Sequence, residues 1–125
     1  MNTLLRFLLV CMVVLVILLS VSSHFGLFVS VGVGDSMEPT IDSVPSLLVH
    51  DRVESIHDVS EGDIVTYYDS EFDTKITHRI IVLDTESDRV VLNGDNTEDS
   101  IRQELTVNEF ESSVDGKIVY VFDLL

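Results

Sequence analysis

The chain has 125 residues and a formal net charge of −15 at pH 7, with 22 acidic residues against seven Lys and Arg. All the acidic residues, and all the basic ones except Arg6, lie at or after Asp35. This length allows one small domain, and this charge excludes a nucleic-acid-binding surface because few cations are present to neutralise phosphates. Since apolar runs recur throughout the acidic part, we interpret it as a folded domain with a solvated, salt-screened surface, and not as a disordered tail.

The N-terminal segment is apolar and almost uncharged. Residues 7 to 34 contain no Asp, Glu, Lys or Arg, and residues 4 to 23 supply the roughly 20 apolar positions that a membrane span needs. Arg6 is the only basic flank, so the positive-inside tendency places the N-terminus in the cytoplasm and the acidic part on the outer face of the cell membrane. A cleaved signal peptide is the alternative, but this apolar run reaches or exceeds its usual core of about 7–15 residues. We therefore expect a single-pass anchor at 1–24 and an extracytoplasmic domain at 25–125.

Short β-branched and aromatic runs separated by turn residues follow the apolar segment. The segment 102–111 is expected to be an exposed turn or a short helix. Together the runs predict a mostly β domain behind one N-terminal helix. The predicted strands are residues 25–33, 46–53, 64–68, 75–83, 89–92 and 116–122.

Ser36 and one of the four histidines have the residue types needed for nucleophilic catalysis. Ser36 lies in a turn shortly after the apolar segment, and a serine is a nucleophile only with a base within hydrogen-bond reach. His78 lies in the middle of a predicted strand, where the ordinary interpretation is a half-buried core residue. His24 fits a membrane boundary. His50 and His57 adjoin acidic residues and are predicted to be surface groups, which leaves His78 as the candidate base.

Candidate carboxylates to orient the histidine lie in the segment 93–99. Asp95 belongs to the turn Gly94-Asp95-Asn96, which directly follows an apolar strand and so places its carboxylate at a rim of the sheet. Asp99 lies four residues further on. In so acidic a chain most carboxylates are solvated surface charges, so neither aspartate stands out by itself.

Taken in order, four segments resemble the conserved boxes of type I signal peptidases. Ser36-Met37-Glu38-Pro39-Thr40 resembles the nucleophile motif, and residues 62–67 resemble the following strand box. Thr77-His78-Arg79-Ile80 resembles the general-base box, and Gly94-Asp95-Asn96 the final box. A histidine in place of the bacterial lysine is similar to the archaeal and endoplasmic-reticulum branch. With the acidic composition, the likeness is to a haloarchaeal, halophilic member.

The resemblance implies a small all-β catalytic domain of a membrane-bound serine endopeptidase that removes signal peptides from preproteins. Ser36 would be the nucleophile, His78 the general base, and two aspartates would orient the imidazole. Asp95 matches the first aspartate, and Asp99 is the nearest candidate for the second, whose usual place is taken by Ile101. The implied partners are signal peptides, the lipid bilayer and the protein-translocation channel. Neither the resemblance nor the residues imply a metal or a cofactor.

The chain departs from the family pattern just before the nucleophile. The family has a small hydroxyl residue two positions before the serine, which in bacterial members helps to build the oxyanion hole, and Gly34 stands there in this chain. Asp35 adds a negative charge beside the developing oxyanion. Because one lost oxyanion donor costs about 2.7–4 kcal/mol, we expect a substitute donor or a slow enzyme, with Gly34→Ser as the test.

Three other interpretations stay open. The departure at Gly34 favours a non-catalytic, membrane-anchored β domain. A self-cleaving regulator of the LexA type has a similar serine motif but needs a lysine base. A secreted binding protein with a cleaved leader would place Ser36 near the mature N-terminus by accident. If the chain is a peptidase, Met37 and the strand 25–33 are expected to lie near the lipid and accept an extended peptide, or simply to pack in the core.

Overall fold

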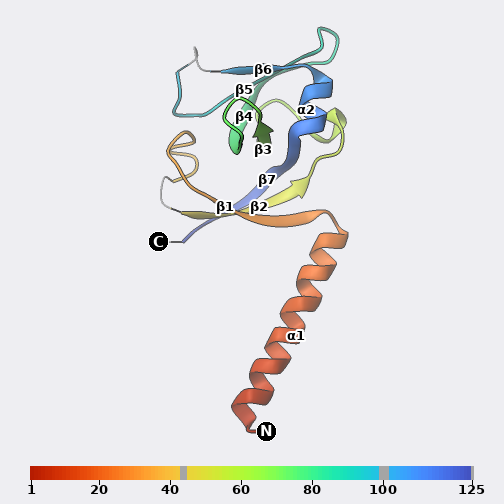
Figure 1. The fold of residues 1–125 in the computed structure, drawn as a ribbon, viewed down its shortest axis with the longest axis vertical. Coiled ribbons are helices and arrows are strands. Elements are labelled where there is room, and N and C mark those ends of the chain that lie inside the picture. The colour runs from red at the N-terminus through yellow and green to blue at the C-terminus, as the bar shows by residue number, and fades with distance from the viewer. Residues whose placement is uncertain (43–44, 99–101, 125) are drawn as a thin grey trace.

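The computed structural model describes residues 1–42, 45–98 and 102–124. A long N-terminal helix leads into a β-rich domain (Figure 1), so the predictions of one apolar helix and of a mostly β domain are confirmed. The elements in chain order are α1 (Thr3–His24), β1 (Leu27–Gly32), β2 (Ser46–Arg52), the short 3-10 helix η1 (Ile56–Asp58), β3 (Ile64–Asp69), β4 (Thr74–Asp84), β5 (Arg89–Asn93), β6 (Gln103–Leu105), α2 (Val107–Ser113) and β7 (Val114–Asp123).

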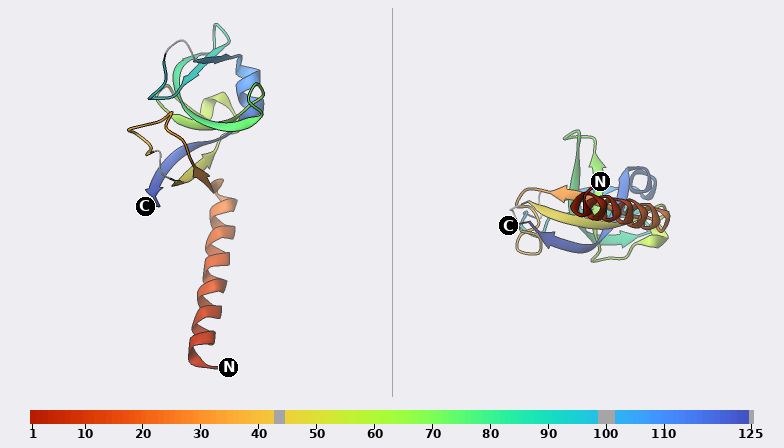
Figure 2. Two further views of the ribbon diagram at one scale, coloured as in Figure 1. Left: turned by 60° about the vertical axis from the view of Figure 1, so that its left-hand side comes forward. Right: turned by 90° about the horizontal axis from the view of Figure 1, so that it is seen from below.

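Helix α1 stands clear of the domain (Figures 1 and 2). It has 22 residues and buries none of them in the protein. Its best window has a mean hydropathy of 3.0, and at 1.5 Å per residue it is about 33 Å long. The side chain of Asn2 caps its first turn by accepting a hydrogen bond from the Leu5 N–H at 2.8 Å. The helix is therefore long and apolar enough to cross a bilayer.

The domain is built on one antiparallel sheet of seven strands in the order β1-β2-β7-β3-β4-β5-β6. Strand β7 lies inside the sheet and pairs with β2 on one side and β3 on the other. Register shifts in three strand pairs mark bulges, which bend strands and increase their twist. The sheet accordingly curls around its own inner face (Figure 2).

Two apolar clusters fill the domain. The larger one packs β3, β4, β5 and α2 together and includes the fully buried Tyr67 and Phe110. The smaller one joins Met37 and Ile41 to Leu48 of β2. Met37 is only 4% exposed, so core packing, and not contact with lipid, is the correct interpretation of this side chain.

For the segment 102–111 the prediction of a short helix is confirmed in its second half, and the prediction of an exposed turn is wrong. The segment contributes strand β6, and α2 begins within it. The Thr106 side chain caps α2 by accepting the Glu109 N–H at 3.2 Å, and Phe110 then enters the larger cluster with no exposed surface. The helix was foreseeable from its cap, whereas the burial of Phe110 depends on strands that are distant in the sequence.

His50 is fully buried, which overturns its prediction as a surface group. Its imidazole stacks on the Phe28 ring at 4.5 Å between centroids, and its Nε2 lies 2.8 Å from the Thr66 hydroxyl. Within the part of the chain that the structure describes, its Nδ1 has no hydrogen-bond partner. His57 is exposed, as predicted, and His24 is exposed at the last residue of α1.

Burial of His50 predicts a loss of stability in mild acid. Desolvation lowers the pKa of this imidazole below its usual 6.5, so the unfolded chain binds a proton that the folded chain resists. Stability is therefore complete above about pH 6.5 and falls by about 1.4 kcal/mol per pH unit as the pH drops toward the folded pKa. His50→Leu should flatten this dependence, measured by chemical unfolding in detergent micelles between pH 5 and 7.5. His57→Leu is the exposed control, and an unchanged slope in His50→Leu would contradict the prediction.

Candidate functional site

Ser36 lies in a loop of residues 33–42, which we call the serine loop, between β1 and β2. The Glu38 N–H donates to the Asp35 carbonyl at 3.1 Å, and the Ile41 N–H donates to the Met37 carbonyl at 2.9 Å. The side chains of Met37 and Ile41 are buried in the smaller cluster, which anchors the loop next to the sheet. Ser36 precedes the first of these anchors and remains half-buried.

The turn Gly94-Asp95-Asn96 holds the serine loop from the other side. The Asn96 N–H donates to the Ser36 carbonyl at 2.8 Å, and the Asn96 side-chain amide donates to the Asp35 carbonyl at 3.1 Å, across 61 residues of sequence. The Thr40 hydroxyl donates to the Asp95 carboxylate. The turn therefore fixes the backbone on both sides of Ser36.

Gly94 lies where Ser36 meets His78. A Cβ added to Gly94 would fall 2.4 Å from the Ser36 carbonyl oxygen and 3.1 Å from His78 Nε2. Only glycine permits so close an approach of backbone to backbone. This contact brings the predicted nucleophile and the predicted base, which are distant in the sequence, to the same place.

His78 extends from β4 and is half-buried, as predicted for a strand histidine. Its Nε2 is directed toward Gly94, and its Nδ1 lies 3.5 Å from the Tyr67 hydroxyl oxygen. Burial lowers the pKa of His78, and the charges of Asp69 and Asp95 partly oppose that effect. The imidazole is therefore mainly neutral at pH 7, which is the form that accepts a proton.

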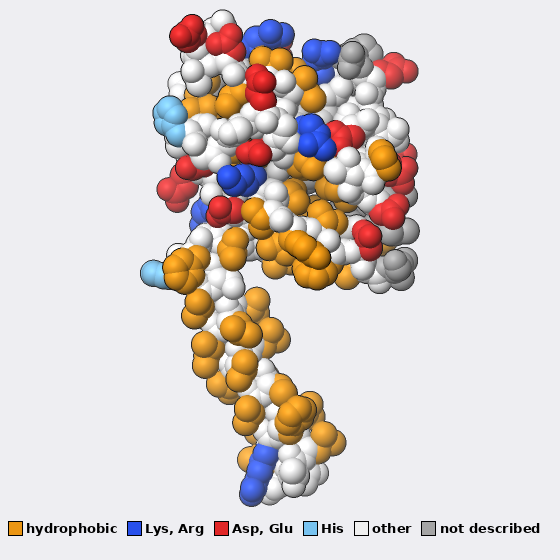
Figure 3. All heavy atoms as spheres, turned by 180° about the vertical axis from the view of Figure 1, so that it is seen from behind, with side chains coloured by type: hydrophobic (Ala, Val, Ile, Leu, Met, Phe, Trp, Pro, Cys, Tyr) orange, Lys and Arg blue, Asp and Glu red, His pale blue; other side chains and the backbone are white. Residues whose placement is uncertain are grey.

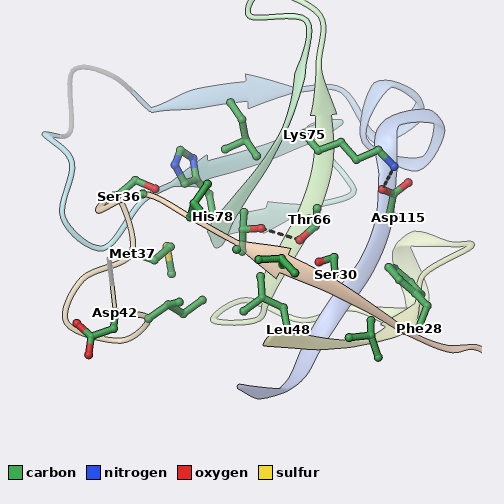
Figure 4. A pocket seen from close by; sticks show the side chains of 18 residues that line it. Phe28, Ser30, Ser36, Met37, Asp42, Leu48, Thr66, Lys75, His78 and Asp115 are labelled. Carbon is green, nitrogen blue, oxygen red and sulfur yellow. Dashed lines mark hydrogen bonds and ion pairs between the residues drawn. The ribbon is translucent and has the colours of Figure 1, made fainter. Parts of the chain in front are cut away.

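Ser36 and His78 lie together at one end of an elongated cleft of about 680 Å³ (Figure 4). We call it the β1 cleft, because residues 28 to 34 of β1 and its extension line it. Leu48 and Ile76 give it an apolar floor, and the ion pair between Lys75 and Asp115 lies at the end away from Ser36 (Figure 4). The shape fits an extended chain lying beside an edge strand.

Asp95 accepts hydrogen bonds from one cation, Arg79, and one hydroxyl, Thr40, and does not hydrogen-bond His78 in the described part of the chain. Both of its oxygens accept bonds from the Arg79 guanidinium, each at 2.8 Å. Arg79 also donates to the Gly62 carbonyl at 2.7 Å. The Arg79 hydrogen bonds lower the pKa of Asp95 and keep it ionised, so it influences His78 through its charge. Asp99, the second predicted carboxylate, lies outside the described residues.

Gly34 has a positive φ of +109°, a conformation that side-chain-bearing residues rarely adopt. Its departure from the family pattern therefore has a conformational reason. A serine at this position would add a hydroxyl donor but also strain of about 1–3 kcal/mol. Gly34→Ser consequently does not isolate the effect of the missing oxyanion donor, because the variant gains a hydroxyl donor and also acquires backbone strain.

Several residues of the site were not singled out by sequence reasoning. Thr40, Arg79 and Asn96 stand inside the segments that carry the resemblance, so their position in those motifs was the available signal. Tyr67 and Gln103 had no such signal as a pair, because they meet only when β3 and β6 are folded into the same sheet.

The arrangement provides a serine hydroxyl, a neutral imidazole and an elongated cleft that begins at both of them. These are three of the parts needed for acyl transfer on an extended chain, and a donor for the oxyanion is the fourth. Among the described residues, no group of three His, Cys, Asp or Glu is placed to hold a metal ion. Comparison of the chain with protein-family models and with curated proteins found no match in either case.

Proposed function

We propose that this protein is a membrane-anchored serine endopeptidase that removes signal peptides from secreted and membrane preproteins. The observation that carries the proposal is that the Ser36 carbonyl and His78 Nε2 both lie so close to Gly94, at the end of the β1 cleft, that a Cβ there would fall within 3.1 Å of each. The likeness of the four sequence segments to signal peptidases of the Ser-His branch supplies the substrate class.

The mechanism assigns a separate role to each group. Ser36 Oγ attacks the scissile carbonyl while His78 Nε2 accepts the hydroxyl proton. His78 then donates a proton to the leaving amine, and a water molecule hydrolyses the acyl-enzyme with the same histidine as base. Asp95, Asn96 and Thr40 hold the loop that carries the nucleophile.

The position of the cleft supports a substrate that emerges from a bilayer. Strand β1 is an edge strand and begins three residues after α1 ends, so the cleft lies close to the end of the apolar helix. Hydrophobic side chains gather at the end of the domain that adjoins α1 (Figure 3). An extended peptide placed beside β1 would enter the cleft directly from the lipid surface. The exposed hydrophobic residues of β1, of the residue directly after it and of β7 are Val29, Val31, Val33, Val119, Tyr120 and Phe122.

The experiment is cleavage of a secretory preprotein with small residues before the cut, in membranes at high salt. Wild type should release the mature protein, whereas Ser36→Ala and His78→Ala should lower the rate by at least about 10³-fold. Ser112→Ala on α2 and His57→Ala are matched controls that change the same residue types at exposed positions outside the cleft, and they should keep most of the activity. Cleavage by Ser36→Ala as fast as by wild type would exclude this serine as the nucleophile.

A non-catalytic, membrane-anchored β domain is the second candidate. The missing hydroxyl at Gly34 and the commitment of Asp95 to Arg79 favour it. On this alternative the β1 cleft binds the peptide, but the wild type leaves the preprotein intact under conditions in which the domain is folded. The same assay, combined with crosslinking of the preprotein to the cleft, separates the two functions.

A further inference from the structure

The imidazole of His78 has a buried polar neighbour at the nitrogen that does not approach Gly94. Its Nδ1 lies 3.5 Å from the Tyr67 hydroxyl oxygen, and the two rings meet edge to face with centroids 6.4 Å apart. Tyr67 is only 1% exposed, so bulk water does not compete for this hydroxyl. Burial also raises the pKa of Tyr67, which keeps the hydroxyl protonated over the whole working pH range.

The Tyr67 hydroxyl begins a chain of hydrogen bonds that ends at a buried carboxylate. The Tyr67 hydroxyl donates to the Gln103 side-chain oxygen, and the Gln103 side-chain N–H donates to Asp69. Asp69 is 5% exposed and also accepts the backbone N–H of Glu71 at 2.8 Å. We call Tyr67, Gln103 and Asp69 the tyrosine relay.

The direction of every bond in the relay follows from the carboxylate. An ionised Asp69 can only accept, so the Gln103 amide must turn its NH₂ toward Asp69 and its oxygen toward Tyr67. Tyr67 therefore gives its single proton to Gln103, and its oxygen is left as an acceptor toward His78. A neutral imidazole that satisfies this acceptor carries its proton on Nδ1 and presents the Nε2 lone pair toward Ser36.

We infer that the tyrosine relay positions His78 as the base, in the place where a directly bonded aspartate would act. This inference rests on the proposed function, and it assigns the orienting carboxylate to Asp69 in addition to the two aspartates expected from sequence. Asp95 has both oxygens engaged by Arg79 and faces His78 only through its charge. Tyr67, Gln103 and Asp69 are thus positioning residues, and none of them touches the substrate.

One charged group besides the relay acts on His78, and the test must separate its influence from that of the relay. Asp95 lies across the site and favours the charged imidazole, as Asp69 does. Arg79 is on the same strand, but its charge is neutralised by Asp95. Removing the relay should therefore lower the pKa of His78 further without abolishing the influence of Asp95.

The experiment uses the full chain with ¹⁵N-labelled histidine in detergent micelles at high salt. Nitrogen chemical shifts give the tautomer and titration midpoint of His78, which is assigned by loss of its signal in His78→Gln. Cleavage of the preprotein gives kcat and KM as functions of pH. The variants Tyr67→Phe and Asp69→Asn keep the size of the side chain and remove, respectively, the acceptor and the charge. The matched controls are Tyr68→Phe and Asp73→Asn, an exposed tyrosine–aspartate pair beginning on the same strand.

Wild type should hold the Nδ1–H tautomer, and both relay variants should move the His78 midpoint to lower pH. Tyr67→Phe should also populate the other tautomer and lower kcat by about 10- to 100-fold with little change in KM, as is typical of partners that orient a functional histidine. The acid limb of the kcat/KM profile should shift with the midpoint, and the controls should match wild type. If Asp69→Asn does not fold, Gln103→Leu removes the acceptor of the Tyr67 proton, which can then be donated to His78 Nδ1, and this variant must populate the other tautomer.

The two proposals fail in different ways. A wild-type tautomer and midpoint in folded Tyr67→Phe would overturn the relay, even if cleavage by the wild type is observed. Conversely, a relay-dependent midpoint in a protein that does not cleave the preprotein would uphold the relay and overturn the peptidase function.

Discussion

Gly94→Ala is expected to lower the rate of peptide cleavage by about 10²-fold or more, because displacement of reacting groups by about 1 Å has an effect of this size. The new methyl group would lie 2.4 Å from the Ser36 carbonyl oxygen, a separation at which one backbone must move away. The serine loop and the Gly94-Asp95-Asn96 turn would then separate, and the hydrogen bond from Asn96 to Ser36 would lengthen. Steady-state cleavage of the preprotein in micelles measures the loss, which should lie in kcat.

Gly26→Ala provides the control for a general effect of replacing glycine. Gly26 also has a positive φ, at +81°, so alanine there strains the backbone, but its nearest contacts are with Asp51 and Arg52 and lie far from Ser36 in the fold. This variant should lose stability and retain the wild-type kcat. Equal activity in Gly94→Ala and wild type would show that the close approach at Gly94 is unnecessary for catalysis.

Phe110→Ala is expected to lower the free energy of unfolding by about 3–5 kcal/mol, the range for truncating a fully buried phenylalanine. Phe110 has no exposed surface and is the only residue of α2 that is fully buried, so its loss leaves a cavity and releases the helix. A loss of this size is a large part of the stability of a small domain. Chemical unfolding followed by circular dichroism, in micelles at high salt, measures it.

Phe72→Ala is the matched control, because this phenylalanine lies in the turn between β3 and β4 with 66% of its surface exposed. Its free energy of unfolding should stay within about 0.5 kcal/mol of wild type, as is usual for surface substitutions. Similar losses of unfolding free energy in both variants would show that burial of Phe110 does not stabilise the domain.

The strands were predictable because each has a run of β-branched residues between turn residues. The run Ile80-Ile81-Val82-Leu83 is typical of a strand wherever it occurs, and it lies within β4. His50 was misjudged because the adjacent Asp51 suggested an acidic surface. The alternation of Ser46, Leu48 and His50 on one face of β2 was the better signal, since every second residue of a strand shares a face.

The site was only partly predictable from the sequence. Ser36 and His78 have residue types that the chemistry requires, so they could be named and their meeting anticipated. The partner of Asp95 could not be predicted, because the chain has several Lys and Arg residues and only the fold brings Arg79 to this carboxylate. The relay from Tyr67 through Gln103 to Asp69 depends on the spatial neighbourhood of β3 and β6, which are separated in the sheet by two other strands.

The hydrogen bonds between Asn96 and the serine loop also set the order in which a competent site can arise during synthesis. Asp35 and Asn96 are 61 residues apart, so the loop that holds Ser36 is made long before the turn that fixes it. Closing a segment of this length requires most of the sheet to be in place, since non-local contacts form only after the entropy of the intervening chain is lost. A nascent chain that has been synthesised only as far as β4 therefore has a serine loop that its partner turn does not yet hold. On the proposed function, folding of the domain would itself complete the catalytic site.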